Sequence, residues 1–478
     1  MRTLGFLFPF LLLSTSLFSQ PNSARLYAMG NVSIAVPDAF GEAFINPARA
    51  TRLDGIAIRL SPSLTRNSNL YEHTSSDNSG GSSQYKSEYS TSSLSLPADA
   101  LMAIGPIHVG ASFSRNSNSY TDSYYSKSTY SSSWNSDENK YEGSTPLTTY
   151  SALAALDLYV VQIGISGALF NSSGTSSSSS GSNSSSGSPY SNLSEQSNEY
   201  SGKSLRIGGS IGSSETFESG AAVFVGSTSN EQKPTRMVWN GVTQPLVDPN
   251  QYRSTESPKS FVVQSRLALT EHFVLGARVS GTSDKGEVFQ KQRYYDPTNP
   301  NGMYEERKTG ETEFSSTEIG AGVTWKTDRS LASVEFVLLP STRTLKSILT
   351  TDYITYDQTY RRGSVSSESE SKSTPKILRL GAEVGILESF VLRAGVETMW
   401  GTLEYSSKDV IYQSTSKTTG APNSSTLGSG GFTLQLSLFR VDYAIVMTPY
   451  GSFYSGPYYY GISSDVLFTH YLSAQIGL

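Results

Sequence analysis

The stretch FVVQSRLALTEHFVLGARVS, residues 261–280, decides the fold of this 478-residue chain. Before the short turn at 270–271, the odd-numbered positions carry Phe, Val, Ser, Leu and Leu, while Gln264 and Arg266 lie between them. After the turn, the odd-numbered positions are apolar again and Arg278 lies among the even-numbered ones. Successive side chains of a strand point to opposite faces. The stretch therefore predicts a β-hairpin with one apolar and one mostly polar face.

The same hairpin pattern occurs seven times along the chain, about 52 to 60 residues apart. The short turns centre near Gly105, Asp157, Ser214, Glu271, Asp328, Glu388 and Arg440. Polar segments of roughly 25 to 35 residues separate one hairpin from the next, which is the rhythm of outer-membrane barrels. A soluble β-sandwich alternates as well. The rhythm predicts an all-β, antiparallel transmembrane β-barrel of about 14–16 strands with long outer loops.

The predicted strands begin near residue 56 and end with the chain, so we assign 56–478 to the barrel. The two weakest strand assignments are 91–103, which contains Pro97, and 441–449. A barrel of fourteen strands would remain if either hairpin were lost.

The N-terminus has the features of a secretory signal peptide. Arg2 precedes an apolar run over 4–13, and the small residues Ser14, Ser16 and Ser19 follow it. The run is too short to cross a bilayer as a helix. We therefore expect 1–19 to be a signal peptide, and this leader, together with the ending of the chain, weighs against a soluble β-sandwich.

The composition excludes several classes of protein. The chain contains no cysteine, which excludes disulfides, thiolate metal sites and lipid attachment through an N-terminal cysteine. Its net charge of −5, from 36 basic and 41 acidic residues, is spread along the chain and forms no basic stripe for nucleic acid. The mean hydropathy of −0.30 suits a barrel in which only alternate residues are apolar.

The segment after the signal peptide does not alternate. It contains SARLYAMG at 23–30, AVPDA at 35–39 and NPAR at 46–49. Small residues allow close backbone approach, prolines interrupt a hydrogen-bonded ladder, and Asp or Asn can bond local backbone groups. These features suit a short plug inside a barrel, which we assign to 20–55. An ordinary periplasmic lead-in with two turns is the alternative.

These motifs resemble the opening of the FadL-like outer-membrane transporter superfamily, in which such elements form a small N-terminal plug. The matching plug or gate positions are Ala28, Met29, Gly30, Asp38, Asn46, Pro47 and Ala48. The ending, with VDYA at 441–444 and THYLS at 469–473, resembles the PorV-like branch of that superfamily. Members of that branch resemble partners in secretion and surface attachment more than transporters.

The chain departs from the fatty-acid transporters of that superfamily in two ways. We expect this chain to lack the longer helical hatch that precedes the plug motif in those proteins, and this expectation favours the PorV-like branch. The chain also ends in IGL at 476–478, where many outer-membrane proteins end in an aromatic residue.

Charged residues occur on the polar faces of the predicted strands and are expected to point into the lumen. They are Arg59, Arg206, Arg266, Arg278, Glu335, Arg379, Glu383, Arg393, Glu397 and Asp442. Intermingled charges of both signs favour paired networks that fill and stiffen the lumen. A charged constriction that selects solutes is the alternative. Glycines on the same faces, such as Gly164, Gly208, Gly276 and Gly395, would leave room for a plug or a ligand.

The predicted outer loops are rich in Ser, Tyr, Asn, Thr and Gly, and 172–189 is almost entirely serine, glycine and asparagine. Such a stretch cannot bury enough apolar area to fold alone. The loop tyrosines, among them Tyr120, Tyr124 and Tyr353, offer rigid contact surfaces for a ligand or partner. A hydrated surface that shields the barrel is the simpler interpretation.

The apparent catalytic and metal-binding motifs of the sequence lack the structural context or the spacing that their chemistry needs. GGSIG at 208–212 matches a nucleophile-elbow pattern, but it lies within an alternating strand rather than a strand–turn–helix. The four histidines lack metal-ligand spacing, and DPTNPNG at 296–302 resembles a loop turn more than a calcium loop. We therefore expect no enzyme activity, no cofactor and no metal.

The sequence leaves three functional hypotheses. The first is passive passage of small hydrophobic molecules, which would be captured among the outer loops, held near the plug and released through the wall or the lumen. The second is a PorV-like scaffold that docks secreted proteins at the cell surface, and the third is a structural or adhesive barrel. The expected partners are outer-membrane lipid and either a small apolar ligand or a secreted protein. The expected location is the outer membrane of a Gram-negative-type bacterium.

Overall fold

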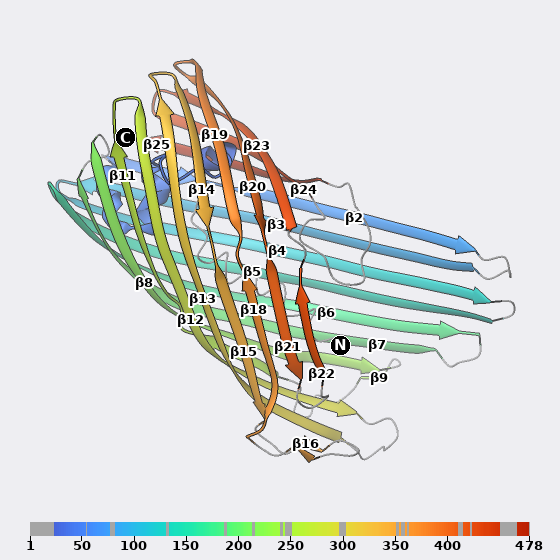
Figure 1. Cartoon of the computed structure of the whole chain (residues 1–478). Helices are drawn as coiled ribbons and strands as arrows, with labels where there is room; N and C mark the ends of the chain where they lie inside the picture. The colour runs from blue at the N-terminus through green and yellow to red at the C-terminus, as the bar shows by residue number, and fades with distance from the viewer. Residues whose placement is uncertain are drawn as a thin grey trace.

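A computed structural model shows one antiparallel sheet rolled into a barrel around a small helical segment (Figure 1). The structure describes residues 23–477 except 54, 77–81, 131–132, 186–188, 213–215, 240–241, 244–250, 296–302, 350–352, 355–358, 361–362, 410–413, 421–422 and 450–465. The predicted signal peptide, 1–19, and the 296–302 turn lie outside the described residues. No helix among the described residues is long and apolar enough to span a bilayer.

The N-terminal half of the sheet contains most of the long strands, together with the short strands β1, β9 and β10. They are β1 (Ile56–Leu60), β2 (Ser63–Ser76), β3 (Ser82–Ile104), β4 (Ile107–Tyr130), β5 (Ser133–Leu158), β6 (Val161–Ser184), β7 (Tyr190–Gly212), β8 (Phe217–Trp239), β9 (Val242–Thr243), β10 (Gln251–Glu256), β11 (Lys259–Ala268) and β12 (Phe273–Tyr295).

The C-terminal half follows the same rhythm with more interruptions. Its strands are β13 (Met303–Lys326), β14 (Ser330–Leu338), β15 (Ser341–Leu349), β16 (Tyr353–Ile354), β17 (Thr359–Tyr360), β18 (Val365–Ser373), β19 (Lys376–Leu387), β20 (Phe390–Gly401), β21 (Leu403–Asp409), β22 (Ser414–Thr419), β23 (Asn423–Leu436), β24 (Phe439–Pro449) and β25 (Val466–Gly477). The pair β16–β17 forms a separate two-stranded sheet.

The barrel closes where the last strand meets the first. β25 pairs with β24 on one side and with β1 and β2 on the other, for example Ala57 with Gly477 and Thr65 with Thr469. Consecutive segments such as β1/β2 or β14/β15 continue one another, so the described chain makes sixteen barrel strands. Both weak assignments are strands, since β3 includes 91–103 and β24 includes 441–449. The predicted fold class is confirmed.

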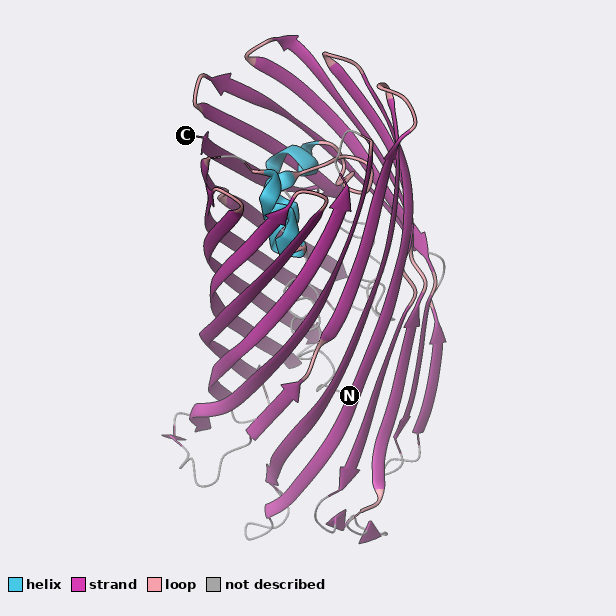
Figure 2. Cartoon of the chain, turned by 90° about the vertical axis from the view of Figure 1, so that its left-hand side faces the viewer, coloured by secondary structure: helices cyan, strands magenta, loops and turns pink. Residues whose placement is uncertain are grey.

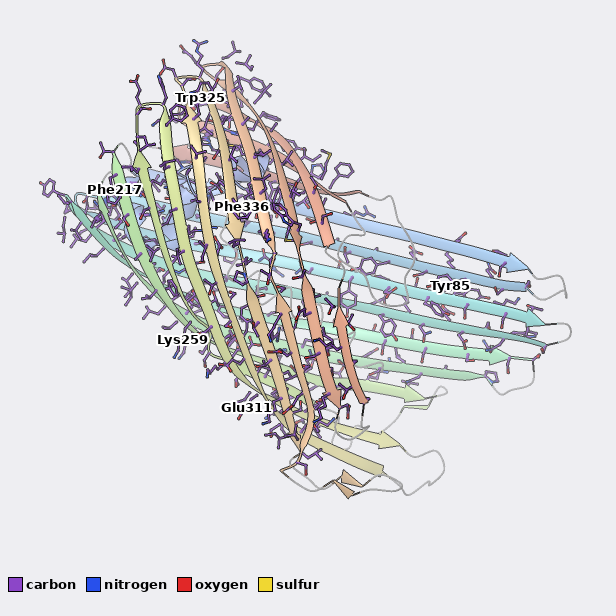
Figure 3. The ribbon with its side chains drawn as sticks, viewed as in Figure 1. Tyr85, Phe217, Lys259, Glu311, Trp325 and Phe336 are labelled. Carbon is purple, nitrogen blue, oxygen red and sulfur yellow. The ribbon has the colours of Figure 1, made fainter. Side chains whose placement is uncertain are left out.

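The outer face of the barrel carries an apolar belt. Outward side chains such as Ile163, Ile207, Val223, Val263 and Val334 are 41% to 55% exposed, which is unusual for large aliphatic residues in a soluble protein. Aromatic residues flank the belt: Phe217, Phe273 and Trp325 lie near the short turns, and Phe113, Tyr150 and Phe336 lie farther along the strands. Figure 3 labels Phe217, Trp325 and Phe336 among them. A closed barrel with such a belt is an outer-membrane protein.

Several strands are longer than predicted. The Ser-rich segment 172–189 was predicted to be part of an outer loop, and this prediction is wrong for most of its length. Up to Ser184 it belongs to β6, which pairs with β5 on one side and with β7 on the other. The segment needs no apolar core of its own, because the neighbouring strands already satisfy its backbone donors and acceptors. Tyr120 and Tyr124 likewise lie on β4, and Tyr353 lies on β16, rather than in irregular loops.

Prolines mark the level at which strands leave the barrel wall. Pro62, Pro258, Pro340 and Pro375 stand at the breaks between β1 and β2, β10 and β11, β14 and β15, and β18 and β19. Proline has no amide hydrogen, so a ladder bond is lost at each break. Pro97 is tolerated within β3 because it lies opposite the break between β1 and β2, where the regular ladder is already interrupted. Its carbonyl still accepts a hydrogen bond from the Ser61 amide at 3.0 Å. Beyond this level the extensions of β2 to β7 and those of β15, β18, β21 and β22 point in different directions (Figure 1).

The apolar belt predicts a depth-dependent cost for an outward charge. Replacing Val334 in the belt by lysine (V334K) should lower the free energy of unfolding from lipid vesicles by about 2–4 kcal/mol. Ser315 points outward on β13 beyond the belt, so S315K should change it by less than about 1 kcal/mol. The measurement is urea-driven unfolding from phospholipid vesicles, and equal costs for the two variants would contradict the assigned belt.

Candidate functional site

The N-terminal segment lies inside the barrel near the end with short turns (Figure 2). It consists of α2 (Ala24–Ala28), α3 (Ala39–Ile45) and the 3₁₀ helix η2 (Pro47–Arg52). We call residues 23–53 the plug. Met29, Val32, Ile34 and Val36 are fully buried between the plug and the wall. The hydrophobic core of this protein therefore lies between the plug and the wall.

The polar residues of the predicted plug motifs organise its turns. Asp38 caps α3 by accepting a hydrogen bond from the Gly41 amide at 3.3 Å. Asn46 caps η2 by accepting from the Ala48 amide at 3.1 Å, and its side-chain amide donates to the Gly209 carbonyl of the wall at 3.0 Å. These contacts fix the ends of helices too short to be stable alone.

Glycines on the inner face of the wall allow the plug to lie directly against the strands, and we call these glycines the seat of the plug. At Gly395 an added Cβ would lie 2.1 Å from the Gly30 amide nitrogen, and at Gly381 it would lie 2.5 Å from the Met29 carbonyl oxygen. Gly30 itself has a φ of +67° and is enclosed by wall backbone. The other wall glycines whose added Cβ would come within 3 Å of the plug are Gly164, Gly208, Gly220, Gly276, Gly320 and Gly431. A side chain at these positions would push the plug away from the wall.

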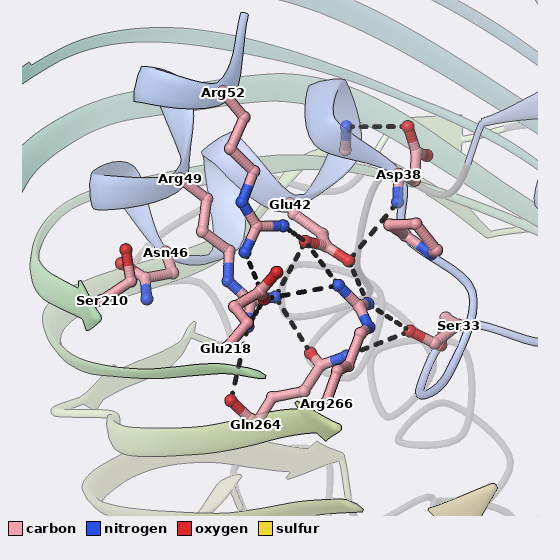
Figure 4. Close-up of polar contacts among 12 residues, drawn as sticks. Ser33, Asp38, Glu42, Asn46, Arg49, Arg52, Ser210, Glu218, Gln264 and Arg266 are labelled. Carbon is pink, nitrogen blue, oxygen red and sulfur yellow. Dashed lines mark hydrogen bonds and ion pairs between the residues drawn. The ribbon is translucent and has the colours of Figure 1, made fainter. Parts of the chain in front are cut away.

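A buried ionic cluster joins the plug to β8 and β11 (Figure 4). In the plug, Arg49 and Arg52 each lie 2.8 Å from the Glu42 carboxylate. From the wall, Arg266 contacts the same carboxylate, and Glu218 lies 2.9 Å from Arg49 and also contacts Arg52. Breaking one partner of a buried network leaves an uncompensated charge, which costs about 3–5 kcal/mol. This cluster therefore locks the plug in place.

The charge state of Glu42 follows from its neighbours. Burial alone would raise the pKa of its carboxyl, but the guanidinium groups of Arg266, Arg49 and Arg52 lower it to about 2. Glu42 is therefore ionised at neutral pH, and the lock is fully formed there.

A second cluster holds the start of the plug against β19, β20 and β24. Arg25 lies 3.0 Å from Glu383, which also pairs with Arg393 at 2.7 Å. Arg393 in turn lies 3.1 Å from Asp442, and Asp442 pairs with Arg440 at 2.9 Å. The network thus runs from the plug across the wall strands.

Wall side chains also bind the plug backbone directly. Glu335, which is fully buried, accepts hydrogen bonds from the amides of Ile34 and Ala35 at 2.5 and 3.1 Å. Arg266 donates to the Ile34 carbonyl at 2.8 Å. The extended part of the plug therefore has its backbone polar groups satisfied by the barrel wall.

The structure places the predicted lumen charges in three groups. Eight form ion pairs: Arg59 with Asp99, Arg278 with Glu318, Arg379 with Glu397, and Arg266, Glu383, Arg393 and Asp442 in the clusters above. Glu335 binds plug amides. Arg206 forms no ion pair with a described residue, and its guanidinium lies over the Phe224 ring, 5.4 Å from the centroid. Eight of the ten charged residues therefore lie in ion pairs, whereas Arg206 lies over an aromatic ring.

Sequence reasoning missed Glu42, Arg49, Arg52 and Arg25 in the plug, and Asp99, Glu218 and Glu318 in the wall. The three wall residues occupy inward positions of alternating strands, so the period of two could have identified them. The plug residues had no such signal, because short irregular helices carry no periodicity.

GGSIG at 208–212 ends β7, as the sequence indicated. The described residues contain no cluster of metal-ligating side chains.

No family model and no curated protein matches this sequence. Among solved structures, the toluene transporter TbuX of Ralstonia pickettii is 10% identical, covers 96% of this chain and 100% of its own, and gives a TM-score of 0.42. A FadL homologue of Pseudomonas aeruginosa is 10% identical over 95% of this chain and 98% of its own, with a TM-score of 0.43. The toluene transporter TodX of Pseudomonas putida gives 10% identity, coverages of 96% and 99%, and a TM-score of 0.40. At such low identities and TM-scores, these similarities carry no conclusion about what this chain binds.

The glycine seat predicts that one added methyl group loosens the plug. Because the chain has no cysteine, V36C supplies a single buried thiol as reporter. In that background G395A should speed maleimide labelling about tenfold, since overpacking costs about 1–3 kcal/mol. G428A is the control, because an added Cβ there meets only the end of Met447 at 3.5 Å. Equal labelling of the two variants would show that Gly395 does not seat the plug.

The lowered pKa of Glu42 predicts an acid-sensitive lock. Its contribution to stability is present above its ordinary pKa and is lost as the pH falls from about 5 toward 2. E42Q should therefore be less stable than the parent by about 3–5 kcal/mol at pH 7, with the difference shrinking over that range. Thermal unfolding in detergent from pH 7 to pH 2 measures this. E313Q, at an exposed pair with Lys285, is the control, and a difference for E42Q that stays constant with pH would contradict the assignment.

Proposed function

We propose that this protein is a passive outer-membrane channel for small hydrophobic molecules, and that the plug must shift for a molecule to pass. The observation that supports this most directly is the plug itself. The chain places residues 23–53 across the lumen and holds them with two ionic clusters and a seat of wall glycines. A purely structural barrel gains nothing from a lumen closed by a reversible set of contacts, whereas a channel needs one.

The strands on the outer side of the plug offer contacts for an amphipathic or apolar solute. Arg206 and Phe224 are paired across β7 and β8, one inward position beyond Gly208, whose space Asn46 of the plug occupies. Farther outward, Phe170 and Tyr200 stack with ring centroids 5.5 Å apart, and the strand alternation puts both on the inward face. An aromatic surface beside an unpaired guanidinium can hold a small solute before the plug moves.

The pairing of the wall favours a path past the plug over a path through the wall at that depth. Where Gly381 and Gly395 face the plug, β19 and β20 pair without interruption from Lys376 to Gly385. The strand breaks at Pro340 and Pro375 lie farther out, beyond the apolar belt. The continuous ladder leaves displacement of the plug as the way through.

Uptake by cells tests the proposal, because an outer membrane slows the entry of apolar solutes. Cells of a Gram-negative host without its own hydrophobic-compound channel should take up a radiolabelled neutral aromatic hydrocarbon severalfold faster when they make this protein. In planar bilayers the parent should conduct few ions, and E42Q/E218Q should conduct more because the lock is broken.

The control for both measurements is E313Q, which lies outside the plug and should behave as the parent. An uptake rate no higher than that of cells without the protein would contradict the proposal, whatever the conductance of the variants.

A second candidate is a PorV-like docking scaffold, which the resemblance of the C-terminal motifs supports. One structural observation favours it: residues 67–76 of β2 pair only with β3, and β22 pairs only with β21, among the described residues. Such unpaired edges can accept a strand from another protein. Native mass spectrometry of the protein extracted gently from its own outer membrane separates the candidates. A stoichiometric protein partner without a small ligand supports docking, and a bound apolar molecule supports passage.

A further inference from the structure

A hollow of about 700 Å³ lies on the lipid-facing side of the wall, across β5, β6, β7 and β8. Its lining includes the outward residues Tyr150, Leu169, Leu205 and Val225, which are 42% to 62% exposed. Between them, Ala152 on β5 faces Gly167 on β6 directly. The hollow exists because two small residues stand where neighbouring outward positions carry large ones.

The barrel itself does not require a glycine at 167. An added Cβ there would meet only the Ser204 carbonyl oxygen at 3.7 Å, which is an ordinary van der Waals contact. The glycines that seat the plug differ, because their added Cβ atoms would come within 3 Å of plug atoms. The missing side chain at 167 therefore leaves space for something outside the protein.

Basic residues stand at the outer edge of the belt. Along β7 the outward side chains from the short turn onward are Ile211, Gly209, Ile207 and Leu205, and the first charge is Lys203, which also lines the hollow. On β11 the first outward charge is Lys259 (Figure 3). Neither lysine forms an ion pair with any residue that the structure describes. Their position is the level at which lipid headgroups begin.

Lys203 and Lys259 lie on either side of the same part of β8. Lys203 pairs with Ser227 of β8, and Lys259 pairs with Val225 two residues away on the same strand. Strand spacing and rise place their Cα atoms about 12 Å apart on one face. Two flexible side chains at that separation can reach a single anionic group.

We propose that this hollow binds a phosphate-bearing, multiply acylated lipid of the outer leaflet, with one acyl chain over Gly167 and Ala152 and its phosphate between Lys203 and Lys259. The apolar lining suits a hydrocarbon chain, and the two unpaired amines supply the complementary charge. The site lies outside the lumen and does not depend on what the channel carries.

Native mass spectrometry in a neutral detergent tests the site, with a purified bisphosphorylated, hexa-acylated lipid A titrated into the full-length protein. K203Q/K259Q should weaken binding about tenfold or more, because each lysine near an anionic headgroup contributes about a fivefold effect. G167L fills the hollow, leaves every charge in place, and should weaken binding to a similar extent.

The matched control is R115Q/K376Q, which removes the first outward charges of β4 and β19 at a similar level without touching the hollow. This variant should bind lipid A with an affinity within about twofold of that of the parent. The parent protein exchanged into fresh detergent before the titration should also bind lipid A within about twofold of the untreated parent. Equal weakening by the control, binding unchanged by G167L, or equally tight binding of a dephosphorylated lipid A would each overturn the proposal.

Discussion

The pairing of β25 with β1 and β2 is the contact on which the rest of the structure depends. In hydrocarbon no water is available to an unpaired amide, so a sheet that spans the membrane must close. Closure here joins the two ends of the barrel, residues 57–60 and 63–66 with residues 474–477 and 468–471. It creates both an outer face that can be almost wholly apolar and a lumen that must be filled or left to water.

The plug fills the lumen near the short turns, and side chains of the wall supply the hydrogen-bond and ion-pair partners that it needs. Its helices are too short to hold themselves, and its buried charges would be costly without partners. Glu335 and Arg266 of the wall satisfy its backbone, while Glu42 gathers three guanidinium groups. The result is a set of contacts that share one carboxylate, that of Glu42. Such an arrangement can hold a lumen closed and still release it.

The sequence predicted the barrel well because one physical constraint repeats along it. Lipid on one face and lumen on the other impose a period of two, and the seven short turns impose the larger rhythm, so even strands such as β3 with Pro97 could be identified. Strand length was underestimated, as in β6, because composition describes what a segment can bury alone and not what its neighbours can pair with. The motif residues of the plug were recognised by resemblance, whereas Arg49 and Glu218 acquire their roles only through contacts between segments about 170 residues apart. Such contacts between distant segments cannot be predicted from the spacing of residues along the chain.

The most direct test of the account asks whether the plug must move. The Cβ of Ala35 lies 3.5 Å from the Cβ that a side chain at Gly322 would have, so A35C/G322C places two thiols at a disulfide separation between plug and wall. The parent chain has no cysteine to interfere. If passage requires the plug to shift, oxidation of this variant should abolish uptake of a neutral hydrocarbon and reduction should restore it. Undiminished uptake through the oxidised, fully cross-linked protein would show that molecules pass without displacing the plug, and it would contradict the central claim.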